Sequence, residues 1–404
     1  MVSLIAGQKS ESEQRILYGV TAATTARAFL RGQLRYFSDM GWDVRLVCGE
    51  GGLEDFAKSE GVSRTYVAPM EREPSRRDPM ALLGLWRVVR RCRPKVTVFG
   101  TPKMGVLGSI AAFACRVPVR IYVVHGFRAE GLSGPRAFVL RALERVACRM
   151  STSVVSVSPS LRALLVDEGV VSPRKAVVLG AGSANGVDLH RFQPVGEDLR
   201  VLIRNELGIP ADACVLSFVG RLSGDKGVAE LAALWRRLLP DLDNAWLVLA
   251  GTHEPSGPDE ARTIEHLLRS ERVRDVGFTD EVEKIYQASD LMILLSKREG
   301  LGMVALEAAA CAVPTIGWVA TGVVDAVRHG DTGVLIEPGD QVALQAATRN
   351  LLNSIEERHR LGLRGRERVE REFSERDVWH RLELHVQGLA RGWSDPAPTR
   401  RGDK

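Results

Sequence analysis

The 404-residue sequence has no apolar run long enough to cross a membrane. Its longest apolar run, Met104 to Cys115, stops before Arg116, well short of the roughly 20 residues that a spanning helix requires. The first residues, MVSLIAGQKSESEQ, contain too short an apolar stretch for a secretory signal peptide. We therefore expect a cytoplasmic protein without a transmembrane helix.

Cysteine pairs and sequence repeats are also missing. The six cysteines are scattered and form no CxxC pair, which argues against a zinc site or a secreted disulfide scaffold. No repeat of 20 to 50 residues and no low-complexity tract appears, so a solenoid is excluded. The polar tail 394–404 is expected to be disordered.

The net charge of +5 hides an asymmetry between the two halves of the chain. Residues 1–195 hold 28 Lys and Arg against 16 Asp and Glu, a net of +12, and residues 196–404 hold 27 against 34, a net of −7. The first half is expected to face an anionic partner, and a membrane surface fits best. Nucleic acid is not expected, because no helix-turn-helix or aromatic-basic sheet pattern appears. Uneven surface charge with no partner is the alternative.

Short β-branched runs alternate with helical patterns, which is typical of parallel sheets covered on both faces. Strands are expected at 15–20, 44–48, 95–99, 119–124, 154–157, 177–179, 214–219, 246–250, 291–295, 313–317 and 334–336. Helices are expected at 31–40, 82–92, 135–148, 228–239 and 301–310. The alternation restarts near residue 214, after a polar stretch. We predict an α/β protein with two doubly wound, Rossmann-like domains, 1–195 and 196–374, and a C-terminal helix at about 375–393 that packs back on the first domain.

The first candidate site directly follows the expected strand 214–219 and reads Gly220-Arg221-Leu222-Ser223-Gly224-Asp225-Lys226-Gly227. Ligands bind at the carboxyl ends of the strands in open parallel sheets. Arg221 and Lys226 thus stand at a ligand-binding edge, and glycines such as Gly220 let the backbone approach closely. The pair suits a diphosphate, because arginine offers a fork of donors and lysine a compact charge. A solvated basic turn without a ligand is the alternative, and the segment is not a Walker A loop.

The second candidate site, from Glu299 to Glu307, follows the expected strand 291–295 and reads EGLGMVALE. The backbone N–H groups of Leu301, Gly302, Met303 and Val304 are expected to point out of a helix N-terminus, where they can bind an anion. Glu299 precedes this helix and Glu307 lies about one turn inside it, so that each carboxylate can accept hydrogen bonds from hydroxyl groups. A buried Glu307 paired with a neighbouring Arg or Lys is the alternative, although buried carboxylates are rare without a purpose.

Together, these segments resemble the donor-binding half of retaining glycosyltransferase family 4. Glu299 to Glu307 matches the E-x7-E pattern of that family, and GlyArgLeu followed by LysGly matches its diphosphate loop. Segment 183–192 resembles the approach to the interdomain linker, and His125 matches a histidine at the N-domain edge of the cleft. The resemblance covers most of residues 15–390 and implies the GT-B fold, in which two Rossmann-like domains face a central cleft.

The resemblance also implies roles for individual residues. Arg221 and Lys226 neutralise the nucleotide diphosphate and stabilise the leaving group, and Glu299 holds hydroxyls of the donor sugar, helped by Gly300 and the N–H groups that follow it. Glu307 holds the ribose. His125 contacts the donor sugar or approaches the acceptor, unless it is a structural histidine that caps the strand.

The sequence departs from the family pattern at three places. Ala312 stands where a glycine is usual, and the later Gly-Gly-x-x-Glu motif is replaced by Thr321-Gly322-Val323-Val324-Asp325. The glycine-rich loop after the first strand is replaced by the segment 21–32, so no phosphate contact is assigned to the first domain.

Asp241-Leu242-Asp243 has the form of the DxD motif that binds a metal and a nucleotide in another glycosyltransferase fold. It precedes an expected strand, which places it at the edge of the sheet away from the ligands. We interpret it as a surface turn, and we expect neither a catalytic metal nor a cofactor beyond the nucleotide sugar.

The expected helix 82–92 and its flanks are strongly basic. Leu82, Trp86 and Val89 alternate with four arginines, at positions 87, 90, 91 and 93, a pattern typical of a helix that lies on anionic lipid. Arg72, Arg76 and Arg77 lie nearby and extend the basic surface. An ordinary helix with a solvated arginine face is an equally good interpretation.

Two further stretches, 101–105 (TPKMG) and 121–130 (IYVVHGFRAE), resemble the branch of the family that builds bacterial capsule and other lipid-linked surface glycans. The implied reaction is the retaining transfer of a hexose or N-acetylhexosamine from a nucleoside-diphosphate sugar, with UDP expected, to a glycan or lipid-linked acceptor. A GT-B-fold isomerase of the nucleotide sugar and a non-catalytic nucleotide-sugar-binding protein are the alternatives.

Overall fold

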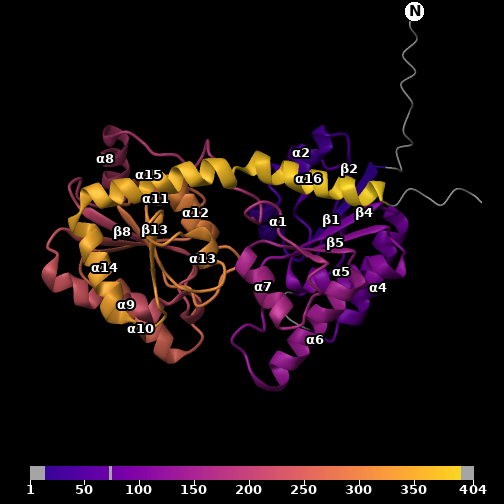
Figure 1. Ribbon diagram of the computed structural model, residues 1–404, viewed down its shortest axis with the longest axis horizontal. Coiled ribbons are helices and arrows are strands. Elements are labelled where there is room, and N and C mark those ends of the chain that lie inside the picture. The colour runs from indigo at the N-terminus through magenta and orange to yellow at the C-terminus, as the bar shows by residue number, and fades with distance from the viewer. Residues whose placement is uncertain (1–13, 72–74, 393–404) are drawn as a thin grey trace, which may run out of the picture. The chain divides into compact units, whose positions relative to one another are not determined.

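The computed structural model describes residues 14–71 and 75–392, which form two α/β units (Figure 1). Unit 1 runs to Val157 and includes Arg162–Gly180 and the C-terminal segment from Val378, and unit 2 consists of Ser158–Leu161 and Ala181–Asp377. Residues 181–195, which we expected in the first domain, group with unit 2 by their contacts. The N-terminal residues 1–13, Arg72 and the tail 394–404 lie outside the described residues.

Unit 1 contains a seven-stranded parallel sheet in the order β3-β2-β1-β4-β5-β6-β7. Its strands are β1 (Arg15–Val20), β2 (Asp43–Cys48), β3 (Arg64–Val67), β4 (Val96–Phe99), β5 (Val119–Val124), β6 (Ser153–Ser156) and β7 (Ala176–Val177). Its helices are α1 (Ala23–Phe29), α2 (Gln33–Asp39), α3 (Glu54–Ser59), α4 (Asp78–Cys92), α5 (Pro102–Ala114), α6 (Gly134–Met150) and most of α7 (Pro159–Asp167). The strand order reverses between β1 and β4, which is the hallmark of a doubly wound sheet.

Side chains of β1 alternate between two cores because successive residues of a strand point to opposite faces. Ile16 and Tyr18 belong to one buried cluster together with Phe37 of α2 and Val386 of α16 (Glu375–Arg391). Leu17 belongs to the other cluster, which α4 and α5 cover. The C-terminal helix therefore completes one of the two cores of unit 1.

Unit 2 contains a six-stranded parallel sheet in the order β10-β9-β8-β11-β12-β13. Its strands are β8 (Cys214–Val219), β9 (Ala245–Ala250), β10 (Val273–Gly277), β11 (Leu291–Leu294), β12 (Thr315–Trp318) and β13 (Gly333–Ile336). Its α-helices are α8 (Glu197–Glu206), α9 (Val228–Leu238), α10 (Pro258–Leu268), α11 (Val282–Ala288), α12 (Met303–Ala310), α13 (Val323–Ala326), α14 (Gln341–Asn353) and α15 (Ile355–Glu372). Short 3₁₀ turns are η2 (Gly224–Lys226) and η3 (Leu239–Asp241). The order reverses between β8 and β11, so the predicted pair of doubly wound sheets is confirmed.

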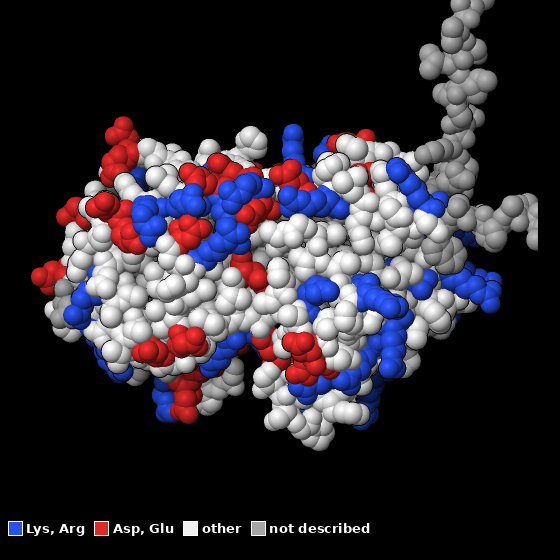
Figure 2. Space-filling view, viewed as in Figure 1, with Lys and Arg blue, Asp and Glu red and all other residues white. Residues whose placement is uncertain are grey.

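The surface of α15 carries charges of both signs, which alternate along the helix in Figure 2. Arg366 pairs with Glu370 at 2.5 Å and Arg368 with Glu372 at 3.0 Å, each four residues apart and thus on one face of the helix. In the described part of the chain, no helix is both long and apolar enough to cross a membrane.

Candidate functional site

The two candidate segments meet at the carboxyl edge of the sheet of unit 2. Segment 220–227 follows β8 and segment 299–307 follows β11, and these strands are neighbours at the point where the strand order reverses. The backbone N–H of Lys297 donates to the carbonyl of Asp225 at 3.0 Å, which ties the two loops together. Ligands of open parallel sheets bind at this edge and at this switch point.

Two glycines permit the close approach of these loops. Gly227 has φ +81°, and a Cβ there would lie 2.3 Å from the carbonyl oxygen of Leu295. Gly322 has φ +76°, and a Cβ there would lie 2.6 Å from the carbonyl oxygen of Glu299. Because L side chains rarely adopt such φ values and no space is left for them, both positions require glycine.

Both predicted cations are held by carboxylates at this edge. Lys226 Nζ lies 2.5 Å from Glu299 Oε1, and Arg221 pairs with Asp225 at 2.8 Å and with Glu254 at 2.9 Å. The Arg221 pairs are about half exposed, and such pairs contribute only about 0–1 kcal/mol. A diphosphate that brings two negative charges can therefore replace Asp225 and Glu254 beside Arg221 at little cost.

The N-terminus of α12 supplies backbone donors next to this cluster. Gly302, with φ +61°, precedes the helix, and Met303 and Val304 are its first two residues. Their N–H groups have no acceptor within the helix, because the first N–H groups of any helix lack an intrahelical partner. Leu301 is only 2% exposed and anchors the turn in the core. The local structure thus agrees with an anion site on these N–H groups.

Glu307 lies one turn inside α12 and faces α11. The hydroxyl of Tyr286 donates a hydrogen bond of 3.0 Å to Glu307 Oε2. Desolvation raises the pKa of Glu307 to about 7, and the hydrogen bond from Tyr286 opposes this rise by favouring the ionised form. Burial and the neighbouring Glu307 carboxylate raise the pKa of Tyr286 well above its usual value. The alternative interpretation, an ion pair of buried Glu307 with an Arg or Lys, is not seen among the described residues, where a tyrosine donates the hydrogen bond.

His125 lies in unit 1, directly after β5. Its ring stacks on Phe29, with centroids 4.8 Å apart, and burial lowers its pKa to about 4. The imidazole is therefore neutral at pH 7, and its buried Nδ1 has no hydrogen-bond partner among the described residues. A neutral ring with an unused polar atom fits hydrogen bonding to a ligand hydroxyl.

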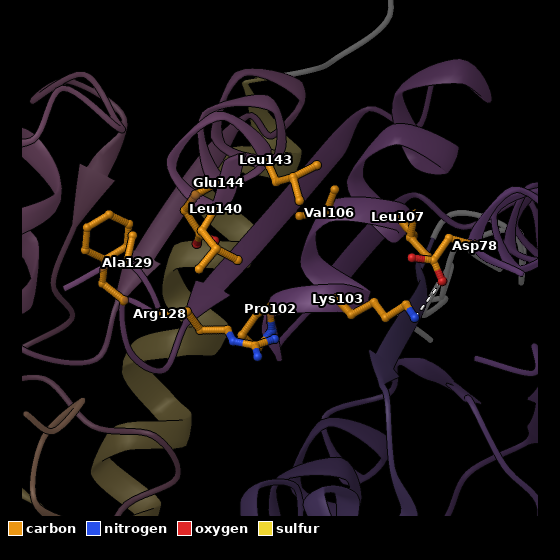
Figure 3. Close-up of a pocket in the computed structure, with 11 residues that line it drawn as sticks. Asp78, Pro102, Lys103, Val106, Leu107, Arg128, Ala129, Leu140, Leu143 and Glu144 are labelled. Atoms are coloured by element: carbon orange, nitrogen blue, oxygen red, sulfur yellow. Dashed lines mark ion pairs between the residues drawn. The ribbon is translucent and has the colours of Figure 1, made fainter. Parts of the chain in front are cut away.

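Unit 1 also contains a pocket that the sequence did not indicate (Figure 3). Apolar side chains of α5 and α6, such as Val106 and Leu143, line it together with the segment that follows β5. Lys103 pairs with Asp78 at 2.6 Å on one side of the pocket, as the dashed line in Figure 3 shows. Glu144 accepts a hydrogen bond of 2.6 Å from Tyr122, and burial raises its pKa to about 7.

The structure places the predicted site residues in two groups. Nine of them gather at the carboxyl edge of unit 2, namely Gly220, Arg221, Lys226, Glu299, Gly300, Leu301, Gly302, Met303 and Val304. Glu307 is part of the same unit, on the helix that starts at this edge, and His125 belongs to unit 1. Sequence reasoning missed Tyr286 and Glu254, since neither lies in a recognisable motif.

The DxD segment does not belong to this group. Asp241 ends η3 and Asp243 is exposed just before β9, so the motif lies at the amino edge of the sheet. Across residues 14–71 and 75–392, no three His, Cys, Asp or Glu side chains cluster as metal ligands.

The apolar residues of the basic helix pack at least partly into the core of unit 1. Val89 of α4 is 1% exposed, and Leu82 and Trp86 pack against the buried core of unit 1. Val89 is thus not free to enter a membrane, whereas Leu82 and Trp86 are half-buried and keep part of their surface exposed. The exposed face of α4 carries Arg87, Arg90 and Arg91, together with Met80, which is 73% exposed, and Leu83, which is 44% exposed.

Comparison with known proteins identifies both halves of the chain. Residues 24–182 match the model of the glycosyl transferase 4-like domain, and residues 200–368 match that of the glycosyl transferases group 1. The chain is 30% identical over 371 residues to CapM of Staphylococcus aureus, a capsular polysaccharide biosynthesis glycosyltransferase, covering 92% of this chain and 96% of CapM. It is 28% identical over 309 residues to the UDP-Gal:alpha-D-GlcNAc-diphosphoundecaprenol alpha-1,3-galactosyltransferase of Escherichia coli, covering 74% of this chain and 77% of that enzyme.

Solved structures share the fold at lower identity. HepE of Anabaena, in complex with UDP-glucose, superimposes with a TM-score of 0.77 at 19% identity, covering 93% of this chain and 99% of that one. Sucrose-phosphate synthase of Thermosynechococcus elongatus gives a TM-score of 0.78 at 20% identity, covering 94% and 100%. These matches confirm the expected GT-B fold.

Proposed function

We propose that this chain, which belongs to the group 1 glycosyltransferases, transfers a hexose or N-acetylhexosamine from a UDP-sugar to a glycan or lipid-linked acceptor in the synthesis of surface polysaccharide. The observation that carries the proposal is the cluster of Arg221, Lys226 and Glu299 beside the N-terminus of α12. The names of CapM and the Escherichia coli relative support the acceptor class. The UDP-glucose complex of HepE supports the donor class.

The chemistry follows from the charge that develops on the departing diphosphate. As the bond between the sugar and the phosphate oxygen breaks, Arg221 and Lys226 stabilise the negative charge on UDP. Glu299, released from Lys226, accepts hydrogen bonds from sugar hydroxyls, and ionised Glu307 accepts them from the ribose. His125, neutral at pH 7, hydrogen-bonds the donor sugar or the acceptor.

We infer a retaining and metal-independent reaction. The two cations supply the charge that a divalent metal would otherwise supply at the diphosphate. The departing phosphate oxygen takes the proton of the acceptor hydroxyl, which attacks from the face that UDP leaves, so the anomeric configuration is kept. No carboxylate nucleophile is needed for this route.

The location that fits this acceptor class is the cytoplasm, with unit 1 on the inner face of the plasma membrane. The exposed arginines Arg87, Arg90, Arg91 and Arg93 support this docking. Each basic residue near an anionic leaflet contributes about 1 kcal/mol, so four of them can hold the protein reversibly. Replacement of all four by Glu should abolish co-sedimentation with phosphatidylglycerol vesicles at low salt. Equal co-sedimentation of the wild type and this variant would rule out the arginine face of α4 as the docking surface.

A donor screen tests the proposal. Purified protein is mixed with UDP- and GDP-sugars, and released nucleoside diphosphate is measured with and without a polyisoprenyl diphosphate-linked sugar as acceptor. We expect UDP release that depends on the acceptor. Conversion of the donor without any acceptor would identify a nucleotide-sugar isomerase, and UDP binding without turnover would identify a non-catalytic binding protein.

A further inference from the structure

A basic hollow opens at the amino edge of the sheet of unit 1. It lies where α4 and α5 end, and it encloses about 850 Å³, counted with the part that is open to solvent. Arg90 and Arg93 line it from the end of α4, and Arg116 lines it from the turn after α5. We call it the arginine hollow. Because it precedes β4 and β5, it lies at the opposite sheet edge from His125, which follows β5.

The positive charge of the arginine hollow exceeds the partial negative charge at the helix ends around it. No Asp or Glu is among its lining residues, and none of its three guanidinium groups pairs with a carboxylate in the described part of the chain. Each helix C-terminus carries about half a negative charge, so the ends of α4 and α5 together offset about one arginine. About two positive charges remain for a ligand.

The backbone at two of these arginines is strained. Arg93 ends α4 with φ +49° and Arg116 follows α5 with φ +54°. This left-handed region favours glycine, which is the usual residue just after a helix. Glycine would end both helices without strain, yet arginine stands at both positions. A strained backbone kept at one hollow from two separate segments points to a function for the side chains.

Aromatic rings accompany the arginines. The guanidinium carbon of Arg90 lies 5.0 Å from the ring centroid of Trp86, which also lines the hollow and holds the cation in place. Phe113, next to the lining residue Ala114, is 51% exposed. A cationic hollow beside an exposed aromatic ring suits the boundary between lipid headgroups and acyl chains.

We propose that the arginine hollow binds the phosphate of an anionic phospholipid headgroup, with Arg90, Arg93 and Arg116 as its ligands. Arginine forks match phosphate oxygens in geometry as well as in charge. The exposed Arg87 and Arg91 of α4 extend the same surface and meet neighbouring headgroups. This binding goes beyond glycosyl transfer and assigns a defined site to the docking of unit 1.

A matched pair of triple variants tests the site against a general charge effect. The variant Arg90→Gln/Arg93→Gln/Arg116→Gln empties the hollow, and Arg64→Gln/Arg136→Gln/Arg174→Gln removes the same charge from exposed positions elsewhere in unit 1. Co-sedimentation with vesicles of phosphatidylglycerol and phosphatidylcholine gives the affinity. Each arginine close to an anionic leaflet contributes about a fivefold factor, so the hollow variant should bind about 100-fold more weakly. The control should stay within about threefold.

Equal losses of vesicle affinity in the two variants would overturn the proposed site, because the overall positive charge of unit 1 would then explain the binding. A second result would also overturn the proposal: inorganic phosphate stabilises the wild type, and the hollow variant binds vesicles as well as the wild type does. The hollow would then bind a free anion rather than a lipid headgroup. Thermal stabilisation by UDP, measured in parallel, should be the same in all three proteins. Loss of that stabilisation in the wild type would count against the proposed transferase without touching this inference.

The variant Arg93→Gly/Arg116→Gly separates binding from a structural role. It removes two cations and relieves the strain at both positions, so the thermal midpoint should stay or rise while vesicle binding falls by about 25-fold. A lower midpoint with unchanged binding would show that the arginines serve the fold and would overturn the proposal.

Discussion

The carboxyl group of Glu307 should make donor binding depend on pH. Its pKa of about 7 means that about one-tenth of it is ionised at pH 6 and about nine-tenths at pH 8. In the proposed binding mode, ribose hydroxyls donate to the ionised form, so only that fraction would bind the donor fully. The affinity for UDP-glucose should therefore be about tenfold higher at pH 8 than at pH 6.

Isothermal titration with UDP-glucose measures this effect directly. UDP-glucose is the right ligand, because its diphosphate is esterified at both ends and keeps a constant charge, whereas the terminal phosphate of UDP titrates near pH 6. Glu307→Gln is the control and should bind more weakly with no slope between these pH values. An equal slope in Glu307→Gln, or a flat profile in the wild type, would refute the role of this carboxyl.

The same group predicts the pH dependence of folding. The pKa of Glu307 in the folded state lies above its usual value, so the folded state holds this proton more tightly than the unfolded state does. The bound proton therefore stabilises the fold fully below about pH 4.5, and this stabilisation is lost as the pH rises to about 7. A shift from 4.5 to about 7 corresponds to at most about 3 kcal/mol. Urea denaturation should show this loss in the wild type relative to Glu307→Gln, and parallel curves for the two proteins would contradict the shifted pKa.

Three further outcomes follow from individual residues. Tyr286→Phe removes a hydrogen bond to ionised Glu307 and should move the pH profile of UDP-glucose binding upward by about one unit; an unmoved profile would contradict the contact. UDP should stabilise the protein equally with and without EDTA, because Arg221 and Lys226 supply the positive charge, and strict dependence on Mg²⁺ or Mn²⁺ would contradict this. Ala312→Gly should raise the free energy of unfolding by up to about 1 kcal/mol, because Ala312 has φ +59°. Ala347→Gly, inside α14, should lower it by about 1 kcal/mol. Urea denaturation measures both changes, and a loss of stability in Ala312→Gly would contradict the strain at this position.

Strong local patterns made most of the fold predictable. The strand at 214–219 is found at the predicted residues, because a buried β-branched run ends at a glycine. β3 and β10 were missed, since both are edge strands with polar residues, Arg64 and Thr65 in one and Arg274 and Asp275 in the other. Apolar periodicity does not reveal such strands, because only one side of them faces a neighbour.

The candidate site was predictable only where one segment carries it. The loops after β8 and β11 were found, since their glycines and charges are contiguous in sequence. Glu307 and Tyr286 are 21 residues apart in the sequence and lie on two different helices, and no pattern in either helix predicts their contact. Ala312 was only partly predictable. The sequence showed that it departs from the family pattern, and the structure adds the positive φ that explains why glycine is usual there.

The role of Lys226 is the central claim, and steady-state kinetics with a UDP-sugar tests it most directly. Lys226→Ala should lower kcat/KM by about 100-fold or more, as the loss of a group that stabilises the leaving charge does at comparable sites. Lys297→Ala is the matched control, since this lysine is 60% exposed on a neighbouring loop and pairs with Glu230 at 3.6 Å. Lys297→Ala should keep the unfolding free energy of the wild type within about 0.5 kcal/mol, and Lys226→Ala, which also breaks the pair with Glu299, should stay folded at a cost of about 1 kcal/mol. Near-normal turnover in Lys226→Ala would show that the diphosphate binds elsewhere and would contradict the proposed site.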